Sequence, residues 1–411
     1  MNTPKPINEK LLLLTLAAIQ FNHILDFVIM MPLGPQLMRY FAITPHQFGM
    51  AVSAYTFSAS IFGLIGAFVI DRFDRKKLLL TLSLGFTLGT LLCGFATHFH
   101  ILLLARILTG AFGGVASSVV LSIIGDVIPE QRRAAATGIV MASFSLASVT
   151  GVPLGIYLAA RFNWHIPFFC IAGSSLLGFL LGLRSLPSMT SHKDSGLSHP
   201  ADLFKTIFTL PSARWALALG MMVMFAGFSV IPFISPYMVA NLGVKESQLS
   251  YMYLAGGLLT FFSSQWVGKL ADRFGKPKVF AILSSVALIP ILWITHMTSH
   301  NLALILFVSS FFFVFVSGRA VPALAMITTA IPPNKRGGFM SINSCLQQLA
   351  CGLAAYLAGV IIQKAPSGEL LQFGHVGAIA ALSSLVAMAI GFMIKPFHHY
   401  SEPAAPTDSV N

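Results

Sequence analysis

The chain is a series of long apolar stretches separated by short segments that carry Gly, Pro and charged residues. A helix needs about 20 apolar residues to cross a hydrocarbon core of roughly 30 Å, and an open sheet edge leaves backbone groups unsatisfied in lipid. The pattern therefore predicts an all-α polytopic membrane protein with twelve transmembrane helices. Those of the first half are residues 11–37, 47–70, 78–97, 101–125, 135–158 and 165–184. Those of the second half are residues 212–240, 248–270, 279–296, 302–330, 338–363 and 374–394.

The twelve predicted helices form two groups of six around the longest polar connection, residues 185–211, which is rich in Ser, His and Pro. Such a composition is typical of a linker. We therefore predict an N-terminal six-helix half over residues 1–184, a C-terminal six-helix half over residues 212–395 and a tail over residues 396–411.

Two segments of the first half recur in the second half at nearly one offset. Residues 67–76, AFVIDRFDRK, return as residues 268–277, GKLADRFGKP, shifted by 201. Residues 128–133, IPEQRR, return as residues 331–336, IPPNKR, shifted by 203. These matches indicate parallel repeats, which in membrane carriers place the substrate between the repeats near the middle of the bilayer.

The charge composition narrows the class of protein. Charged residues make up 9% of the 411 residues and hydrophobic residues 56%, whereas soluble domains carry roughly 25% charged residues. This excludes a soluble enzyme, a disordered regulator and a secreted disulfide module.

The net charge of +12 has a topological explanation. Nineteen of the 25 Lys and Arg residues fall in the predicted segments on one side of the membrane and four on the other. Cytoplasmic loops collect basic residues, so both termini are predicted to be cytoplasmic and no nucleic-acid partner is expected. Short outer loops and the lack of an N-x-S/T sequon agree with a multi-pass protein of a bacterial inner membrane.

Neither metal nor enzyme chemistry is indicated. The four cysteines (Cys93, Cys170, Cys345 and Cys351) lie in apolar runs without a CxxC pair, and the 12 His residues are scattered. No Walker motif and no clustered acid, base or metal set is present. We therefore expect no metal, no cofactor and no catalytic residue.

Three motifs carry a resemblance to a known family. Residues 268–276 match the pattern G-x-L-A-D-R-x-G-R/K, whereas the first copy has Ala67 and Asp74 in place of its glycines. Residues 106–114, RILTGAFGG, are similar to an R-x-x-x-G segment, and residues 151–155, GVPLG, to a shortened antiporter motif. On these motifs the chain resembles, over essentially its whole length, the major facilitator superfamily (MFS), and within it the twelve-span drug:proton antiporters and arabinose-efflux-like permeases.

The resemblance implies the MFS fold and a secondary active transporter that exports a small organic molecule by alternating access and proton-coupled antiport. One alternative is a proton-coupled or facilitative uptake carrier for an anionic metabolite. The other is a non-transporting receptor or scaffold. The expected partners are a small-molecule substrate, protons and the lipid bilayer, and the chain is expected to be a monomer.

The motifs also imply gating residues. A carboxylate at a helix end accepts hydrogen bonds from helix N-termini and from Arg, which would latch neighbouring helices on the cytoplasmic side. The alternative is a tight basic turn that fixes only the topology. In the antiporter motif, Gly and Pro permit close helix contact and a bend. The candidates are Asp71, Arg72, Arg75, Asp272, Arg273, Gly151, Pro153 and Gly155.

Ionisable residues inside a membrane are functional candidates by default, and two of them have matching depths. At a rise of ~1.5 Å per residue, Asp26 and Arg106 each lie about 8 Å from the outer edge of the bilayer core, so an Asp–Arg pair is allowed. His23 lies on the same helix face as Asp26. We predict that Asp26, with Arg106 and His23, exchanges the proton, because burial and a nearby Arg change the proton affinity of a carboxyl in opposite directions. The alternative is a permanent ion pair that ties spans one and four together.

Arg319 is a third intramembrane charge, and no acidic residue on a second-half span is available to pair with it. Because an unpaired buried Arg is costly, we predict that it binds a carboxylate or phosphate of an anionic or zwitterionic substrate. The alternative is an Arg bonded to carbonyls freed near Pro322. Further substrate-binding candidates, for which packing or interhelical hydrogen bonding is the alternative, are Asn22, Phe228, Phe233, Asn343 and Gln347.

Overall fold

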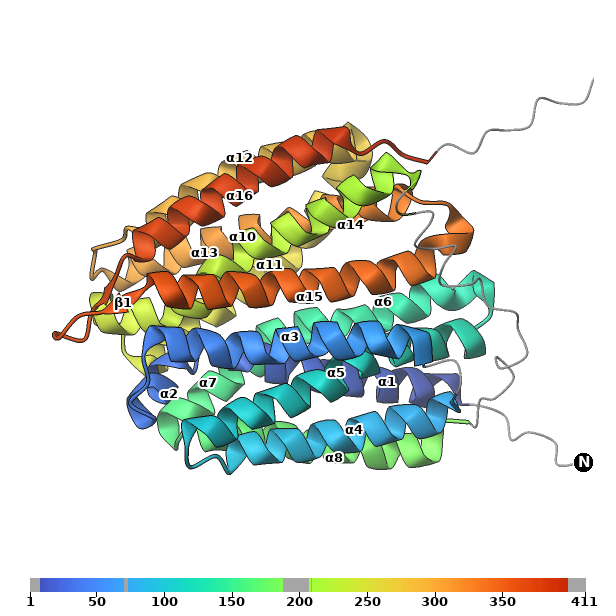
Figure 1. Ribbon diagram of the computed structural model, residues 1–411, viewed down its shortest axis with the longest axis horizontal. Coiled ribbons are helices and arrows are strands. Elements are labelled where there is room, and N and C mark those ends of the chain that lie inside the picture. The colour runs from blue at the N-terminus through green and yellow to red at the C-terminus, as the bar shows by residue number, and fades with distance from the viewer. Residues whose placement is uncertain (1–7, 70–72, 188–206, 208, 398–411) are drawn as a thin grey trace, which may run out of the picture.

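The computed structural model describes residues 8–69, 73–187, 207 and 209–397 and is almost entirely helical (Figure 1). The helices before the linker, called the first group, are α1 (Glu9–Ile29), α2 (Gly34–Tyr40), α3 (Pro45–Val69), α4 (Arg75–Gly94), α5 (Phe99–Val127), α6 (Glu130–Leu146), the π-helical turn η2 (Ala147–Gly151), α7 (Val152–Arg161) and α8 (His165–Ser185). Those after it, called the second group, are α10 (Pro211–Leu242), α11 (Glu246–Phe274), α12 (Lys276–Thr295), α13 (Leu302–Gly318), α14 (Ala320–Thr329), the 3-10 turn η4 (Pro333–Lys335), α15 (Arg336–Ile361) and α16 (Phe373–Met393). Two short antiparallel strands, β1 (Gln363–Lys364) and β2 (Leu370–Leu371), precede α16.

Each of the twelve predicted membrane helices coincides with a helical segment of the structure. Eleven segments of the described chain are long and apolar enough to cross a membrane. The predicted span 248–270 falls in α11, which has 29 residues but is not among the eleven. It carries Ser, Thr and Gln along its length and Lys269, Asp272 and Arg273 near its end, which explains why it is not among the eleven.

Two predicted helices are interrupted at prolines. The predicted helix 11–37 ends early, because the chain turns at Pro32 before α2 begins. The predicted helix 302–330 breaks at Arg319, between α13 and α14. Pro322 has no N–H to donate to the carbonyl four residues earlier, which explains the break. Arg319 therefore lies at a helix junction and not within a continuous helix.

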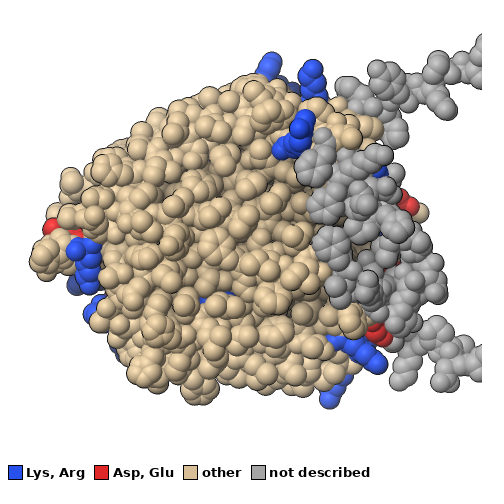
Figure 2. Space-filling view, viewed as in Figure 1, with Lys and Arg blue, Asp and Glu red and all other residues tan. Residues whose placement is uncertain are grey.

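The two ends of the bundle are made of different segments (Figure 1). The start of α1, the end of α8, the start of α10 and the end of α16 lie at one end, called the linker end. The opposite end, called the hairpin end, carries α2 and the pair β1–β2. Figure 2 shows a largely uncharged face between the two ends, with the Lys and Arg side chains gathered toward them. This distribution suits an apolar belt in the bilayer core.

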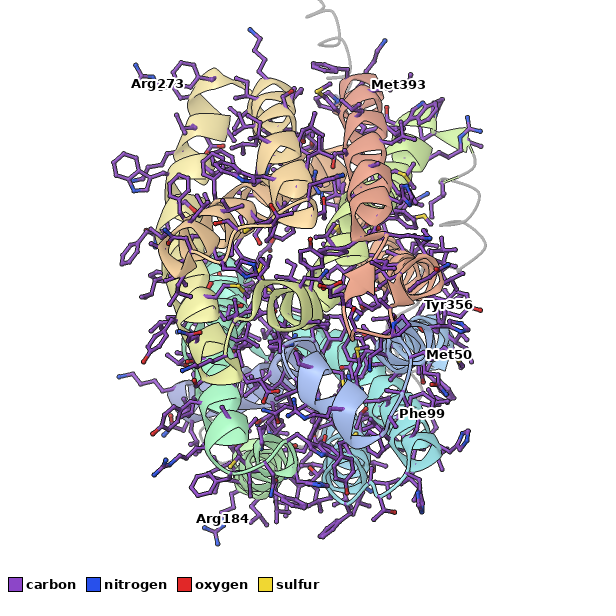
Figure 3. The ribbon with its side chains drawn as sticks, turned by 90° about the vertical axis from the view of Figure 1, so that its left-hand side faces the viewer. Met50, Phe99, Arg184, Arg273, Tyr356 and Met393 are labelled. Atoms are coloured by element: carbon purple, nitrogen blue, oxygen red, sulfur yellow. The ribbon has the colours of Figure 1, made fainter. Side chains whose placement is uncertain are left out.

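The two groups meet along α3 and α15 and along α7 and α11. The view from the hairpin end shows the second group above the first, with Met50 of α3 and Tyr356 of α15 at their boundary (Figure 3). A Cβ atom on Gly49 would lie 2.7 Å from the carbonyl oxygen of Ala355 and 3.2 Å from the Cα of Gly359. The backbones of α3 and α15 therefore touch because glycine occupies this position.

Candidate functional site

The interior of the first group contains a fully buried ion pair. The Arg106 Nη1 atom, from α5, lies 2.7 Å from the Asp26 Oδ2 atom, from α1, and both side chains have 0% exposure. The hydroxyl of Thr90, from α4, donates to the other carboxylate oxygen of Asp26 at 3.3 Å. The matching depths expected from the sequence thus correspond to a direct contact, and the role of this pair in proton exchange stays a prediction.

The aromatic ring of Tyr55, from α3, covers the guanidinium of this pair. The Arg106 Cζ atom lies 4.6 Å from the centre of the Tyr55 ring, within the range of a cation–π contact. The R-x-x-x-G segment explains the position. A Cβ atom on Gly110 would lie 2.2 Å from the Tyr55 carbonyl oxygen, and one on Gly113 would lie 2.8 Å from the Tyr55 hydroxyl. The two glycines therefore let α3 approach α5 closely enough to hold Tyr55 over Arg106.

Two other predicted residues of α1 lie differently. His23 is buried, packs edge-on against Phe86 with ring centres 4.3 Å apart, and has no hydrogen-bond partner on either ring nitrogen within the described chain. Asn22 donates to the Ala18 carbonyl at 2.9 Å and accepts a hydrogen bond from Ser174 of α8. The structure therefore brings His23 near Asp26, whereas Asn22 is engaged with α8.

Arg319 lies in the other group and is also fully buried. Its Nη1 atom donates to the hydroxyl of Ser384, on α16, at 2.7 Å. Its Nε and Nη2 atoms have no hydrogen-bond partner among the described residues. The structure therefore does not bring Arg319 to the Asp26–Arg106 pair, and it leaves part of the guanidinium unsatisfied.

The two predicted aromatic residues of α10 face the first group. The Phe228 ring stacks on Phe27 of α1 with centres 5.6 Å apart. The Phe233 ring, fully buried, meets Phe48 of α3 edge-on at the same separation. Both residues thus contribute to the contact between the two groups.

Asn343 and Gln347 lie against α10 within the second group. A Cβ atom on Gly220 would lie 2.5 Å from the Asn343 Oδ1 atom and 2.9 Å from the Gln347 Nε2 atom. Asn343 is buried, and its Oδ1 atom has no partner within the described chain. The two amides therefore fill the seam between α10 and α15.

The two copies of the loop motif differ in their contacts. Asp71 and Arg72 lie outside the described residues. In the first copy, the Arg75 Nε atom lies 2.5 Å from the Asp126 Oδ2 atom at the end of α5. In the second copy, Asp272 is exposed without an ion pair in the part of the chain that the structure describes, and the Arg273 guanidinium lies over its neighbour Phe274. The copy that departs more from the family pattern is thus the one that joins two helices.

The antiporter-motif residues pack α7 against α1. A Cβ atom on Gly151 would lie 2.9 Å from the Leu25 side chain, and one on Gly155 would lie 2.6 Å from the Ile29 side chain. Pro153 is buried in the first turn of α7, just after the π-helical turn η2. The close helix contact expected from this motif is therefore present.

At the hairpin end, a contact that was not predicted from the sequence joins the first group to the second. The Glu246 carboxylate, at the start of α11, accepts hydrogen bonds from Arg39 at 2.7 Å and from Gln36 at 2.8 Å, both on α2. Thr90, Tyr55 and Glu246 were all missed. Thr and Tyr are common in membrane helices, and a Glu in a loop carries no signal until its partner is known.

Two groups of apolar helices related by sequence repeats, the first of which contains a buried ion pair, define a polytopic membrane protein. The chain belongs to the Major Facilitator Superfamily, whose family profile matches residues 16–236 and again residues 216–408. It is therefore a multi-pass membrane protein and a secondary transporter with the MFS fold.

Two relatives are similar in sequence to this chain over most of its length. The uncharacterized MFS-type transporter YceJ of Bacillus subtilis is 24% identical over 366 residues, covering 89% of this chain and 91% of the relative. The uncharacterized MFS-type transporter YwfA from the same organism is 26% identical over 382 residues, covering 90% of this chain and 87% of the relative. These matches support the superfamily, and the antiporter or efflux subgroup stays a prediction.

Solved structures agree on the fold. A bacterial homolog of the human lysosomal transporter Spinster, in an inward-facing and occupied conformation, has a TM-score of 0.75 at 16% identity, covering 95% of this chain and 97% of that chain. A D-xylose–proton symporter has a TM-score of 0.75 at 15% identity, covering 92% and 96%. At these identities the likeness concerns the fold alone.

Proposed function

We propose that this transporter exports a small organic molecule by alternating access and that it exchanges the molecule for protons at Asp26. The observation that carries the proposal is the fully buried Asp26–Arg106 pair. An ion pair out of water is costly to maintain, and a buried carboxylate that alternately gains and loses access to water is suited to take up and release one proton. His23, buried one turn nearer the linker end and without a hydrogen-bond partner among the residues that the structure describes, supports a path for that proton.

The proposed cycle uses the contacts between the two groups. In this structure α2 and α11 are joined at the hairpin end by the hydrogen bonds to Glu246. We place the linker end in the cytoplasm of a bacterial cell, because most Lys and Arg residues belong to the segments at that end. Opening at the hairpin end then requires these bonds to break. The Arg75–Asp126 pair at the linker end joins α4 to α5 within the first group, and we propose that it keeps these two helices together as the cytoplasmic side opens.

For the substrate, we propose an anionic or zwitterionic molecule that reaches Arg319 when the second group rearranges. The supporting observation is a buried guanidinium with two nitrogen atoms unsatisfied in the described chain. A carboxylate or phosphate matches the planar fork of Arg. The antiporter motif around Gly151 favours export over uptake by resemblance.

The test uses purified protein in liposomes that enclose a pH-sensitive dye, with an imposed pH gradient and a panel of anionic, zwitterionic, neutral and cationic compounds. We expect some compounds to release protons through the wild type and not through Asp26→Asn. Glu369→Gln is the matched control, because Glu369 is an exposed carboxylate at the hairpin end. Compound flux that continues unchanged in Asp26→Asn, with the same proton release, contradicts the proton role.

The substrate class is tested in the same liposomes with Arg319→Ala and Arg319→Lys. We expect Arg319→Ala to lose the anionic and zwitterionic compounds selectively, and Arg319→Lys to keep part of that transport because it keeps the charge. Equal loss of neutral and cationic compounds would instead indicate that Arg319 supports the fold.

A further inference from the structure

Three stacked aromatic rings connect the buried ion pair to the second group. The Tyr55 ring, which lies under the Arg106 guanidinium, stacks on the Phe27 ring with centres 5.2 Å apart and planes 22° apart. The Phe27 ring stacks in turn on Phe228 of α10, with centres 5.6 Å apart and planes 23° apart. A continuous line of contacts thus runs from Asp26 and Arg106 to the opposite helix group.

Each of the three rings is coupled to a different part of the fold. Phe27 directly follows Asp26 in α1, so a change at the carboxylate acts on its neighbour in the chain. The backbone of Tyr55 has little freedom, because it is pressed against Gly110, and only its ring can tilt. Phe228 lies four residues before Pro232, which has no N–H to donate to the Phe228 carbonyl. Helix α10 therefore lacks a hydrogen bond at the residue that carries the third ring, and a second one four residues further on because of Pro236, so it bends easily over this stretch.

We propose that the Tyr55–Phe27–Phe228 stack transmits the state of the ion pair to the second group, so that a proton at Asp26 changes the closure of the hairpin end. This inference rests on the proposed proton exchange at Asp26. When Asp26 gains a proton, its charge-assisted bond to Arg106 weakens, and the guanidinium keeps its hydrogen bond to the Asp26 carbonyl and its contact with the Tyr55 ring. The tilt of Tyr55 and Phe27 that follows weakens their stack on Phe228 and lets α10 bend.

The titratable groups around Asp26 come from four helices. They are Arg106 of α5, Tyr55 of α3, Cys93 of α4 and His23 of α1 itself. The ring that reaches the second group, Phe228, carries no charge. The transmitted signal is therefore a change of ring packing and not a proton passed between the groups.

The experiment measures the distance between spin labels on Thr97 and Thr298, two exposed residues of turns at the hairpin end, one in each group. The full chain, with its four cysteines replaced and cysteines introduced at these two positions, is placed in lipid nanodiscs and measured at several pH values. Phe228→Ala removes the third ring, Phe228→Tyr keeps it, and Asp26→Asn removes the titrating carboxylate. Phe225→Ala is the matched control, because Phe225 belongs to the same helix and lines a small pocket between α10, α15 and α16.

We expect the distance distribution of the wild type, Phe225→Ala and Phe228→Tyr to change with pH, and that of Asp26→Asn to stay fixed. Phe228→Ala should lose the pH response and favour the open hairpin end by about two- to tenfold, the contribution of an aromatic pair. A pH response in Phe228→Ala equal to that of the wild type, with Asp26→Asn fixed, overturns the stack and leaves the proton role standing. A wild type that responds no more than Asp26→Asn overturns both. If Phe228→Ala does not fold, Phe27→Leu makes the same test from α1.

Discussion

The two helix groups share one architecture but have different polar interiors. At the repeat offset of 203 residues, α5 (residues 99–127) corresponds to residues 302–330, which form α13 and α14. At that offset Ser309 corresponds to Arg106 and Ser229 to Asp26. Both serines are buried and donate to carbonyls of their own helices, each at 2.7 Å. The ion pair of the first group is thus replaced by two hydroxyl groups that each bond within their own helix.

The charge of the second group lies elsewhere, at Arg319, whose counterpart at the same offset is Ala116. Within the described chain, one group therefore holds a carboxylate–guanidinium pair, and the other holds a guanidinium with two nitrogen atoms that have no partner. The carboxylate of the pair can lose its charge by gaining a proton, whereas the lone guanidinium can be neutralised by an anionic partner. This difference supports assigning the proton to the first group and the substrate to the second.

The largest change in stability should come from removing one partner of the Asp26–Arg106 pair. Asp26→Ala leaves the Arg106 guanidinium buried without a counter-charge, so we expect a loss of about 3–5 kcal/mol in the free energy of unfolding. The double variant Asp26→Ala, Arg106→Leu should recover most of that loss and remain inactive. Thermal unfolding in detergent measures both, and Ser229→Ala is the control, expected to cost about 1 kcal/mol or less. Equal stability of the single and double variants would contradict the pairing.

Removing the charge of Arg319 should change the stability in the opposite direction. Replacing Arg319 with Met removes two donors that have no partner in the described part of the chain, so we expect the free energy of unfolding to rise by about 1–3 kcal/mol while transport of anionic compounds falls. The same unfolding measurement and the liposome assay give the two quantities. A destabilised Arg319→Met would mean that the guanidinium has a stabilising role, and the contrast between the groups would then fail.

The third effect concerns the contact between the groups. Arg39 is largely exposed and Glu246 partly so, and exposed ion pairs contribute about 0.2–1 kcal/mol. Glu246→Gln should therefore favour the open hairpin end by up to about fivefold, measured with the labels on Thr97 and Thr298. Raising the salt concentration should reproduce part of this change in the wild type. A change that salt does not reproduce would point to the Gln36 bond as the stronger of the two.

The smallest effect compares the two copies of the loop motif. Asp126→Asn weakens the bond to Arg75 and should cost about 1 kcal/mol, whereas Asp272→Asn, at an exposed position, should stay within about 0.5 kcal/mol of the wild type. Thermal unfolding distinguishes the two. The reverse order would show that the better-preserved copy, and not the first, joins helices in solution.

The sequence was sufficient for the helices and for the matching level of two of their charges. Apolar runs predict the helices by composition alone, and the helical rise predicts that Asp26 and Arg106 lie at one level, as their contact confirms. Hydropathy did not predict that prolines interrupt two of these helices. The break at Arg319, for example, depends on one missing N–H at Pro322.

The partners of the candidate residues were not predictable in the same way. Asn22 shares a helix with Asp26 but is bonded to Ser174, because α8 packs there. Tyr55 lies under Arg106 only because Gly110 allows α3 to approach. Such contacts depend on how helices distant in the sequence are rotated against each other. Periodicity gives no information on that rotation.

The glycine contact between α3 and α15 has a kinetic consequence. At Gly49 and Gly359 this seam brings backbone against backbone, whereas about two turns away the Phe57 ring of α3 packs against Gly352 of α15. Sliding at the glycine contact itself requires no side chain to leave and re-enter a pocket, so this contact adds little to the activation barrier of the transport cycle. The rate of interconversion should instead be governed by the few specific contacts that must break, those of Glu246 and of the Phe228 ring.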